Sequence, residues 1–202
     1  INEDLKRIEY GYWFLNDGER TYLTGGHYFF LQHYKHYDTN KFGDFRRTQM
    51  FIFYYIAACY ADSRSLGFLL LKNRGVAFSS IGASEVLRLT CTRTNVFAPL
   101  VSKTENDAEK LFQQKISFPL RQLPIYITPI NSSKDKAVKN RIDFTDPKSK
   151  FGNESAIEKY PCTVDAYDGT RPKISLNDEL FKYKKFSVNT YWDTHKDCHT
   201  TG

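Results

Sequence analysis

Residues 42–60 read FGDFRRTQMFIFYYIAACY and carry the clearest helical pattern of the chain. Residues four positions apart share one face of a helix, and here that face carries Phe45, Gln49, Phe53 and Ala57. Further apolar side chains widen this face until the segment is apolar on nearly all sides. A helix of that kind is enclosed by the protein core. We therefore expect a deeply buried, aromatic-rich helix over residues 42–60.

A second, amphipathic helix is predicted over residues 105–116. Thr104 precedes it and can accept a hydrogen bond from the backbone N–H of Asp107, as helix-capping residues do. Proline lacks a backbone N–H and ends most helices, so Pro119 is expected to stop this one.

The N-terminal region predicts a β-hairpin. Asp17-Gly18 supplies the positive φ angles of a tight turn, and aromatic residues on either side predict strands at 8–15 and 20–23. The following segment, residues 27–37, fits either a strand or a short helix, because its periodicity does not separate the two.

Short apolar stretches later in the chain predict further strands. Residues 85–94 alternate apolar and polar side chains, a pattern typical of a half-exposed antiparallel strand. The other predicted strands are residues 66–71, 76–80, 125–130, 163–166, 173–176 and 186–191. Strands and helices do not alternate regularly, so we expect an α+β fold with a mainly antiparallel sheet.

The chain is expected to form one domain. Its 202 residues are enough for one substantial core, and 41% of them are hydrophobic, which excludes a disordered chain. Residues 131–155 are rich in Lys, Asp, Asn and Ser, and they predict a polar surface loop. The sequence therefore predicts a single α+β domain over residues 1–202.

The charge of the chain is compatible with several kinds of partner. Its 29 Lys and Arg outnumber 23 Asp and Glu, for a net charge of +6, and the excess is spread evenly. Such a balance suits nucleic acid, phospholipid or acidic partners. No apolar run approaches the roughly 20 residues that a helix needs to cross a bilayer, so no membrane span is expected.

Four cysteines bear on the compartment. Cys59, Cys91, Cys162 and Cys198 contain no CxxC pair, which excludes zinc-ribbon and thioredoxin-type motifs. Their even number, the start at Ile1 and two N-x-S/T sequons favour an exported or extracytoplasmic protein. The preferred disulfides are then Cys162–Cys198 and Cys59–Cys91; the alternative is four free thiols in the cytoplasm.

The histidines form two groups, and no motif assigns them a chemistry. His195 and His199 have the helical spacing that can direct two imidazoles to one metal, but no HExxH motif is present, and we expect no metal site and no cofactor. The chain also lacks a GxSxG motif, a P-loop and a GxGxxG motif. If the protein is an enzyme, the first catalytic candidates are His27, His33 and Glu19.

One segment mixes aromatic and basic side chains. Residues 33–37 read HYKHY, a mixture that suits a groove stacking bases and contacting phosphates. An ordinary amphipathic segment whose rings pack inward has the same composition. The predicted partner-binding residues are Tyr34, Lys35, His36, Tyr37, Arg46 and Arg47.

Three functions remain open from the sequence. The first is a non-catalytic binding or assembly domain of a larger exported or particle-associated complex, contacting a protein partner through an aromatic and basic surface. The second is a hydrolase or transferase whose residues come together only in three dimensions. The third is a nucleic-acid-binding domain.

Overall fold

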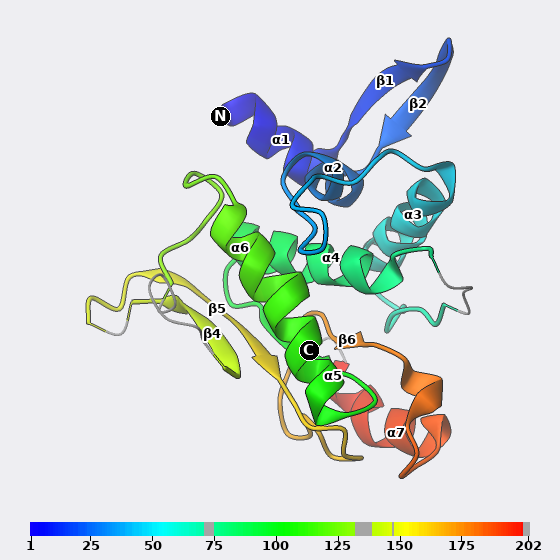
Figure 1. The fold of residues 1–202 in the computed structure, drawn as a ribbon, viewed down its shortest axis with the longest axis vertical. Coiled ribbons are helices and arrows are strands. Elements are labelled where there is room, and N and C mark those ends of the chain that lie inside the picture. Colours follow the sequence, from blue (N-terminus) through cyan, green and yellow to red (C-terminus); the bar gives the residue numbers. More distant parts are fainter. Residues whose placement is uncertain (71–74, 132–138, 147, 200–202) are drawn as a thin grey trace.

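The computed structural model describes residues 1–70, 75–131, 139–146 and 148–199, which form helices and strands in an α+β arrangement (Figure 1). The predicted fold class is confirmed. The helices are α1 (Asn2–Tyr10), α2 (Gly25–Gln32), α3 (Arg47–Ala61), α4 (Phe78–Thr92), α5 (Glu105–Lys110), the π-helix η1 (Leu111–Ser117), α6 (Phe118–Gln122), the short 3-10 helices η2 (Leu180–Lys182) and η3 (Lys196–His199), and α7 (Val188–His195). The strands are β1 (Tyr12–Asn16), β2 (Glu19–Leu23), β3 (Phe97–Val101), β4 (Arg141–Thr145), β5 (Gly152–Lys159) and β6 (Leu176–Asn177).

Strands β1 and β2 form the predicted hairpin, which projects from the body of the protein (Figure 1). Its turn residues Asp17 and Gly18 have φ angles of 51° and 81°, which a tight hairpin turn requires. The predicted first strand began too early. Residues up to Tyr10 belong to α1, and Gly11, with φ of 71°, separates this helix from the hairpin.

The second sheet has four strands in the order β4-β5-β3-β6. Strands β4 and β5 are antiparallel, whereas β3 runs parallel to both of its neighbours, β5 and β6. The antiparallel pairing that we expected therefore holds for the hairpin and for β4-β5. Parallel pairing of β3 brings the carboxyl ends of three strands to one edge of the sheet.

Helix α3 begins five residues later than predicted, at Arg47, and it is buried on one side only. Its inner face includes Phe53 and Ile56, while Phe51 and Tyr55 are 56% and 67% exposed. The enclosed central helix is instead α4, which is buried at almost every position from Ser80 to Cys91.

The predicted strand at residues 85–94 is wrong, because most of this segment lies in α4. Its polar residues do not mark a solvent-facing side. Arg88 is paired with Glu85 at 2.8 Å inside the core, and the Thr90 hydroxyl donates to the carbonyl of Val86 in the preceding turn. Polar groups satisfied in this way can be buried at little cost.

The second predicted helix is present and longer than expected. The Thr104 hydroxyl accepts from the backbone N–H of Asp107 at 3.1 Å, as predicted. The helical path continues from α5 through η1 into α6, where Pro119 occupies the first turn. Proline has no N–H to donate to the Lys115 carbonyl four residues earlier, but that carbonyl accepts from the Tyr34 hydroxyl at 2.9 Å instead. Pro119 therefore does not end the helix.

The loop expected at residues 131–155 is replaced in part by regular structure. Strand β4 and the start of β5 lie within it, and Ile142 and Phe144 are buried in the core; residues 132–138 and 147 lie outside the described residues. Five further predicted strands are also wrong. The described part of 66–71 and all of 125–130 and 163–166 lie outside the strands, residues 78–80 begin α4, and residues 188–191 begin α7. Of the strand predicted at 173–176, only Leu176 lies in a strand, β6.

Neither predicted disulfide forms: Cys59, Cys91, Cys162 and Cys198 are all unpaired. Cys91 lies buried in α4, and the Cys198 thiol contacts Asp168 Oδ1 at 3.8 Å. The C-terminal stretch does not need a disulfide to join the rest of the protein. The structure supplies the core of this stretch as a second cluster, built from Val101, Ala166, Tyr167, Tyr183 and Tyr191. Among the described helices, none is long and apolar enough to cross a membrane.

Candidate functional site

The carboxyl ends of β3, β5 and β6 meet at one edge of the sheet, because these strands are parallel. Polar residues follow two of them directly: Ser102 and Lys103 after β3, and Asp178 and Glu179 after β6. In open sheets with parallel strands, ligands bind outside the carboxyl ends. This edge of the sheet is therefore a candidate ligand site.

Helix α4 begins at this same edge. The hydroxyl of Ser79, the second residue of α4, lies 2.9 Å from both carboxylate oxygens of Asp178. Sheet and helix also touch through Gly82, where a side chain would collide with Leu176 of β6. The start of the helix and the end of the strand are thus in direct contact.

The start of α4 has an unusual backbone. Its N-cap residue, Ala77, is left-handed, with φ of 60°, and offers no side-chain cap; Gly75 has φ of 92°. A left-handed conformation is strained in residues other than glycine and recurs at ligand sites. Successive N–H groups in such a turn, together with the positive end of a helix dipole, form a concave surface that attracts anions.

A cavity of about 350 Å³ opens beside this turn. The residues that line it are His36, Asp38, Gly75, Ala77, Phe78, Ser79, Ser80 and Lys115. Lys115 comes from the π-helical segment η1, whose wider turn is common at functional sites. Its carbonyl accepts a hydrogen bond from the buried Tyr34 hydroxyl at 2.9 Å, and its ammonium group lies 3.4 Å from Asp38 Oδ2. Lys115 is thereby held at the cavity wall.

Two groups at the site have shifted pKa values. Burial, and then the positive charge of Lys115, lower the pKa of His36. Hydrogen bonds from Lys103 and Lys182 lower the pKa of Glu179, and Lys103 Nζ lies 2.6 Å from Glu179 Oε2. The site therefore holds an ionised carboxylate next to Asp178.

The side chains of Ser79 and Asp178 could bind a metal ion whose remaining ligands come from a bound molecule. Within the described ranges, no group of three His, Cys, Asp or Glu residues could hold a metal alone. Mg²⁺ does not need such a group, because it usually takes one or two carboxylates and completes its shell with water and substrate phosphates. Ser79 and Asp178 offer a hydroxyl and a carboxylate at the same point.

The three catalytic candidates from the sequence lie apart from one another. His27 is fully buried, with its ring stacked between Phe45 and Phe53 at 5.4 and 4.8 Å. His33 bonds to Asp4 of α1 at 3.2 Å and ties α1 to α2. Glu19 stands at the exposed hairpin, 3.5 Å from Arg47.

The predicted partner-binding residues are also dispersed. Tyr34 is fully buried, and His36 lines the cavity. Lys35 lies over the Phe42 ring at 5.5 Å, and the half-exposed Tyr37 packs against Phe118. Arg46 and Arg47 are exposed where α3 begins.

The two C-terminal histidines take part in packing and hydrogen bonding. The His195 ring lies 4.1 Å from that of Tyr167 and 4.2 Å from that of Tyr191, and its Nδ1 bonds to the Tyr191 carbonyl. His199 Nε2 contacts the hydroxyls of Ser175 and Tyr167.

Sequence reasoning missed Ser79, Lys115 and Asp178. The pattern of residues 76–80 predicts a strand, whereas the structure places the serines of this segment at the start of α4. One signal was available: a glycine turn leading to paired serines at the start of a helix, with Asp-Glu after a later apolar stretch. The consensus phosphate loop places a lysine directly before its Ser or Thr, and Phe78 occupies that position here.

Comparison with known proteins assigns no family: no family model matches the chain, and no curated protein matches it significantly. A fold alone does not define a function. The function must therefore be argued from the geometry of the site.

Proposed function

We propose that the protein binds the polyphosphate chain of a nucleotide together with Mg²⁺ and hydrolyses it. The observation that carries this proposal is the contact between Ser79 and Asp178 beside the cavity at the start of α4. A hydroxyl at a helix start, paired with a carboxylate that follows a parallel strand, holds Mg²⁺ in enzymes of phosphoryl transfer. The proposal corresponds to the hydrolase alternative that the sequence left open.

Each part of the site has a role in this chemistry. The uncapped backbone N–H groups at the start of α4 would bind phosphate oxygens, aided by the helix dipole. Ser79 and Asp178 would ligate Mg²⁺ with those oxygens. Glu179 follows Asp178 in the sequence and is ion-paired with Lys103 and Lys182; its carboxylate would orient the attacking water. Lys115, which also lines the cavity, adds positive charge.

The test is nucleotide binding and phosphate release in Ser79→Ala and Asp178→Asn. A fluorescent ATP analogue is titrated with and without Mg²⁺, and released phosphate is measured with ATP, GTP and pyrophosphate. Loss of a metal ligand should weaken Mg²⁺-dependent binding at least about tenfold and abolish hydrolysis.

Two variants with equivalent chemical changes serve as controls. Ser63→Ala and Asp193→Asn alter exposed side chains outside the cavity, and both should behave as the wild type. Binding that is independent of Mg²⁺, or unchanged in both site variants, would refute the proposal.

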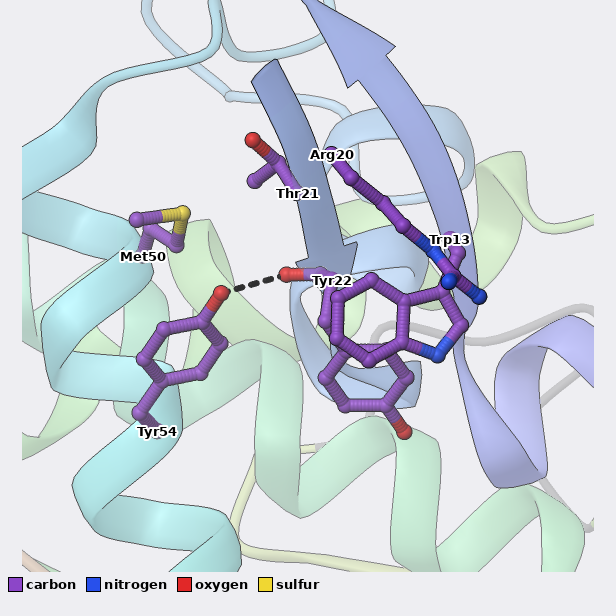
Figure 2. Close-up of a pocket in the computed structure, with 6 residues that line it drawn as sticks. All are labelled: Trp13, Arg20, Thr21, Tyr22, Met50 and Tyr54. Atoms are coloured by element: carbon purple, nitrogen blue, oxygen red, sulfur yellow. Dashed lines mark hydrogen bonds between the residues drawn. The ribbon is translucent and has the colours of Figure 1, made fainter.

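A second candidate function, protein binding, is favoured by the exposed aromatic face of the hairpin and α3. Trp13 and Leu15 are 56% and 75% exposed on the outer side of β1. Figure 2 shows the hollow between hairpin and helix, where Trp13 and Tyr22 face Met50 and Tyr54. Exposed patches of this kind often mark interaction sites. Such a surface fits the assembly domain expected from the sequence.

We propose as its occupant an apolar segment of another protein that carries a carboxylate. The Arg20 guanidinium stacks over Trp13 at 4.7 Å, and it would pair with that carboxylate.

A fluorescence titration tests the second function with peptides that combine glutamate with leucine or phenylalanine. In Trp192→Phe, Trp13 is the remaining tryptophan, so its emission reports directly on the hollow. We expect a saturable change in emission that Arg20→Ala weakens. No response to any peptide, or dimerisation in its place, would refute this assignment.

A further inference from the structure

Strand β6, which precedes Asp178, is short, so its position depends on the hydrogen bonds around it. It comprises only Leu176 and Asn177, paired with Leu100 and Val101 of β3. The backbone N–H of Asp178 continues this ladder and donates to the Val101 carbonyl at 2.9 Å. These bonds hold the main chain from the side of β3.

The side chain of Asn177 is held by the C-terminal cluster. Its Oδ1 accepts from the Tyr191 hydroxyl of α7 at 2.7 Å. Its Nδ2 donates to the Tyr167 hydroxyl at 3.4 Å and to Ser175 Oγ at 3.3 Å. Three hydroxyl groups thus surround the amide of the residue directly before Asp178.

Tyr191 is itself firmly placed. Its side chain is 2% exposed, and its ring stacks on Phe186 at 5.5 Å and on His195 at 4.2 Å. The bond between His195 Nδ1 and the Tyr191 carbonyl adds to this packing. A buried, fully bonded tyrosine is a rigid support for a neighbouring polar side chain.

We infer that Tyr191 is a positioning residue for the metal site, acting through Asn177 on Asp178 and Glu179. This inference rests on the proposed function. The carboxylate of Asp178 has to meet Ser79 from a two-residue strand, and the residue after it, Glu179, has a left-handed backbone with φ of 56°. The hydrogen bond from Tyr191 fixes the last strand residue before that turn. The C-terminal segment is thereby part of the site, although it does not line the cavity.

The test is Tyr191→Phe, which removes one hydroxyl and keeps the stacked ring. Hydrolysis is measured against Mg²⁺ concentration and then against ATP concentration. We expect the Mg²⁺ concentration for half-maximal activity to rise about fivefold, the effect of losing one hydrogen bond. We also expect kcat to fall by a similar factor while KM for ATP changes little, because α4 still binds the phosphates.

Tyr160→Phe is the matched control. The Tyr160 hydroxyl donates to Glu158 Oε2 at 3.0 Å, and its ring packs against the same cluster. Both variants should lower the midpoint of thermal unfolding alike, but only Tyr191→Phe should change the Mg²⁺ dependence. Tyr167→Phe, which removes another partner of Asn177, provides a second measurement if Tyr191→Phe folds poorly.

The outcomes separate this inference from the proposed function. Wild-type Mg²⁺ dependence in Tyr191→Phe and Tyr167→Phe, with Asp178→Asn inactive, would overturn the inference alone. An equal change in Tyr160→Phe would also overturn it, because the effect would then be one of general stability. Wild-type activity in Asp178→Asn would overturn the proposed function, and the inference with it.

Discussion

At the scale of single residues, two histidines show how burial changes a polar group. His33 keeps a carboxylate partner in Asp4. His27 has none: among the described residues, neither of its ring nitrogens has a hydrogen-bond partner. An unsatisfied buried polar group lowers stability. His27 is therefore an unfavourable polar residue of the core.

We predict that His27→Phe stabilises the protein by about 1–2 kcal/mol at pH 7, the usual cost of an unsatisfied buried polar group. The replacement ring can stack with Phe45 and Phe53 as the imidazole does. Chemical denaturation measures the free energy of unfolding. A loss of stability would show that the two nitrogens are satisfied in solution.

Burial of His27 should also make the stability of the protein sensitive to acid. Burial lowers the pKa of His27 from 6.5 to about 4, so the unfolded state takes up the proton first as the pH falls. Stability is then lost between about pH 6.5 and pH 4, by roughly 3 kcal/mol at most. His27→Phe should remove this part of the pH dependence, which denaturation at pH 7 and pH 4.5 would reveal.

Replacement of Lys103 should change the pH profile of hydrolysis. Its hydrogen bond is the main reason that the pKa of Glu179 is lowered. In Lys103→Met the pKa of Glu179 should rise, although Lys182 remains. Because the protonated carboxyl cannot orient water, the acid limb of kcat should move to higher pH. An unshifted limb would exclude Glu179 from this role.

At the scale of elements, the start of α4 combines structural strain with the proposed function. Ala77 caps the helix in a left-handed conformation that costs an L-residue about 1–2 kcal/mol. Such strain persists where the surrounding structure requires it. Here it accompanies a helix start at which the Ser80 N–H already donates to the Ala77 carbonyl at 3.0 Å, so the proposed phosphate contacts would come from the N–H groups of Phe78 and Ser79.

We predict that Ala77→Gly raises the free energy of unfolding by up to about 1 kcal/mol, since glycine adopts positive φ without strain. Ala77→Val should lower it by about 1–2 kcal/mol, because a β-branched side chain fits this conformation poorly. Denaturation of the three proteins side by side measures both changes. The opposite order would show that the turn relaxes in solution.

At the scale of the whole molecule, the C-terminal segment is attached by packing and hydrogen bonds. Tyr167, Tyr183 and Tyr191 form its core, and all four cysteines of the chain are unpaired. We predict four reactive thiols in denatured, unreduced protein, and little change in the proteolysis of residues after 160 in Cys198→Ser. Fewer than four reactive thiols would indicate that a disulfide is present. An exported location stays a prediction, because unpaired cysteines do not bear on it directly.

Features that depend only on neighbouring residues could be predicted from the amino-acid sequence. Asp17-Gly18 specified the hairpin turn, and Thr104 with Asp107 specified the start of α5, because each acts within a few residues. The helical spacing of apolar residues before Tyr60 likewise specified a helix, α3.

The depth at which each element is buried, and the position of the candidate site, depend on the tertiary structure. Residues 85–92 form a helix because their polar groups find partners there, such as Glu85 for Arg88. Ser79 and Asp178 are 99 residues apart, and they meet because β3 pairs in parallel with β6. No local pattern encodes that pairing. It depends on hydrogen bonds and burial between distant segments, and so the site exists only once the chain has folded.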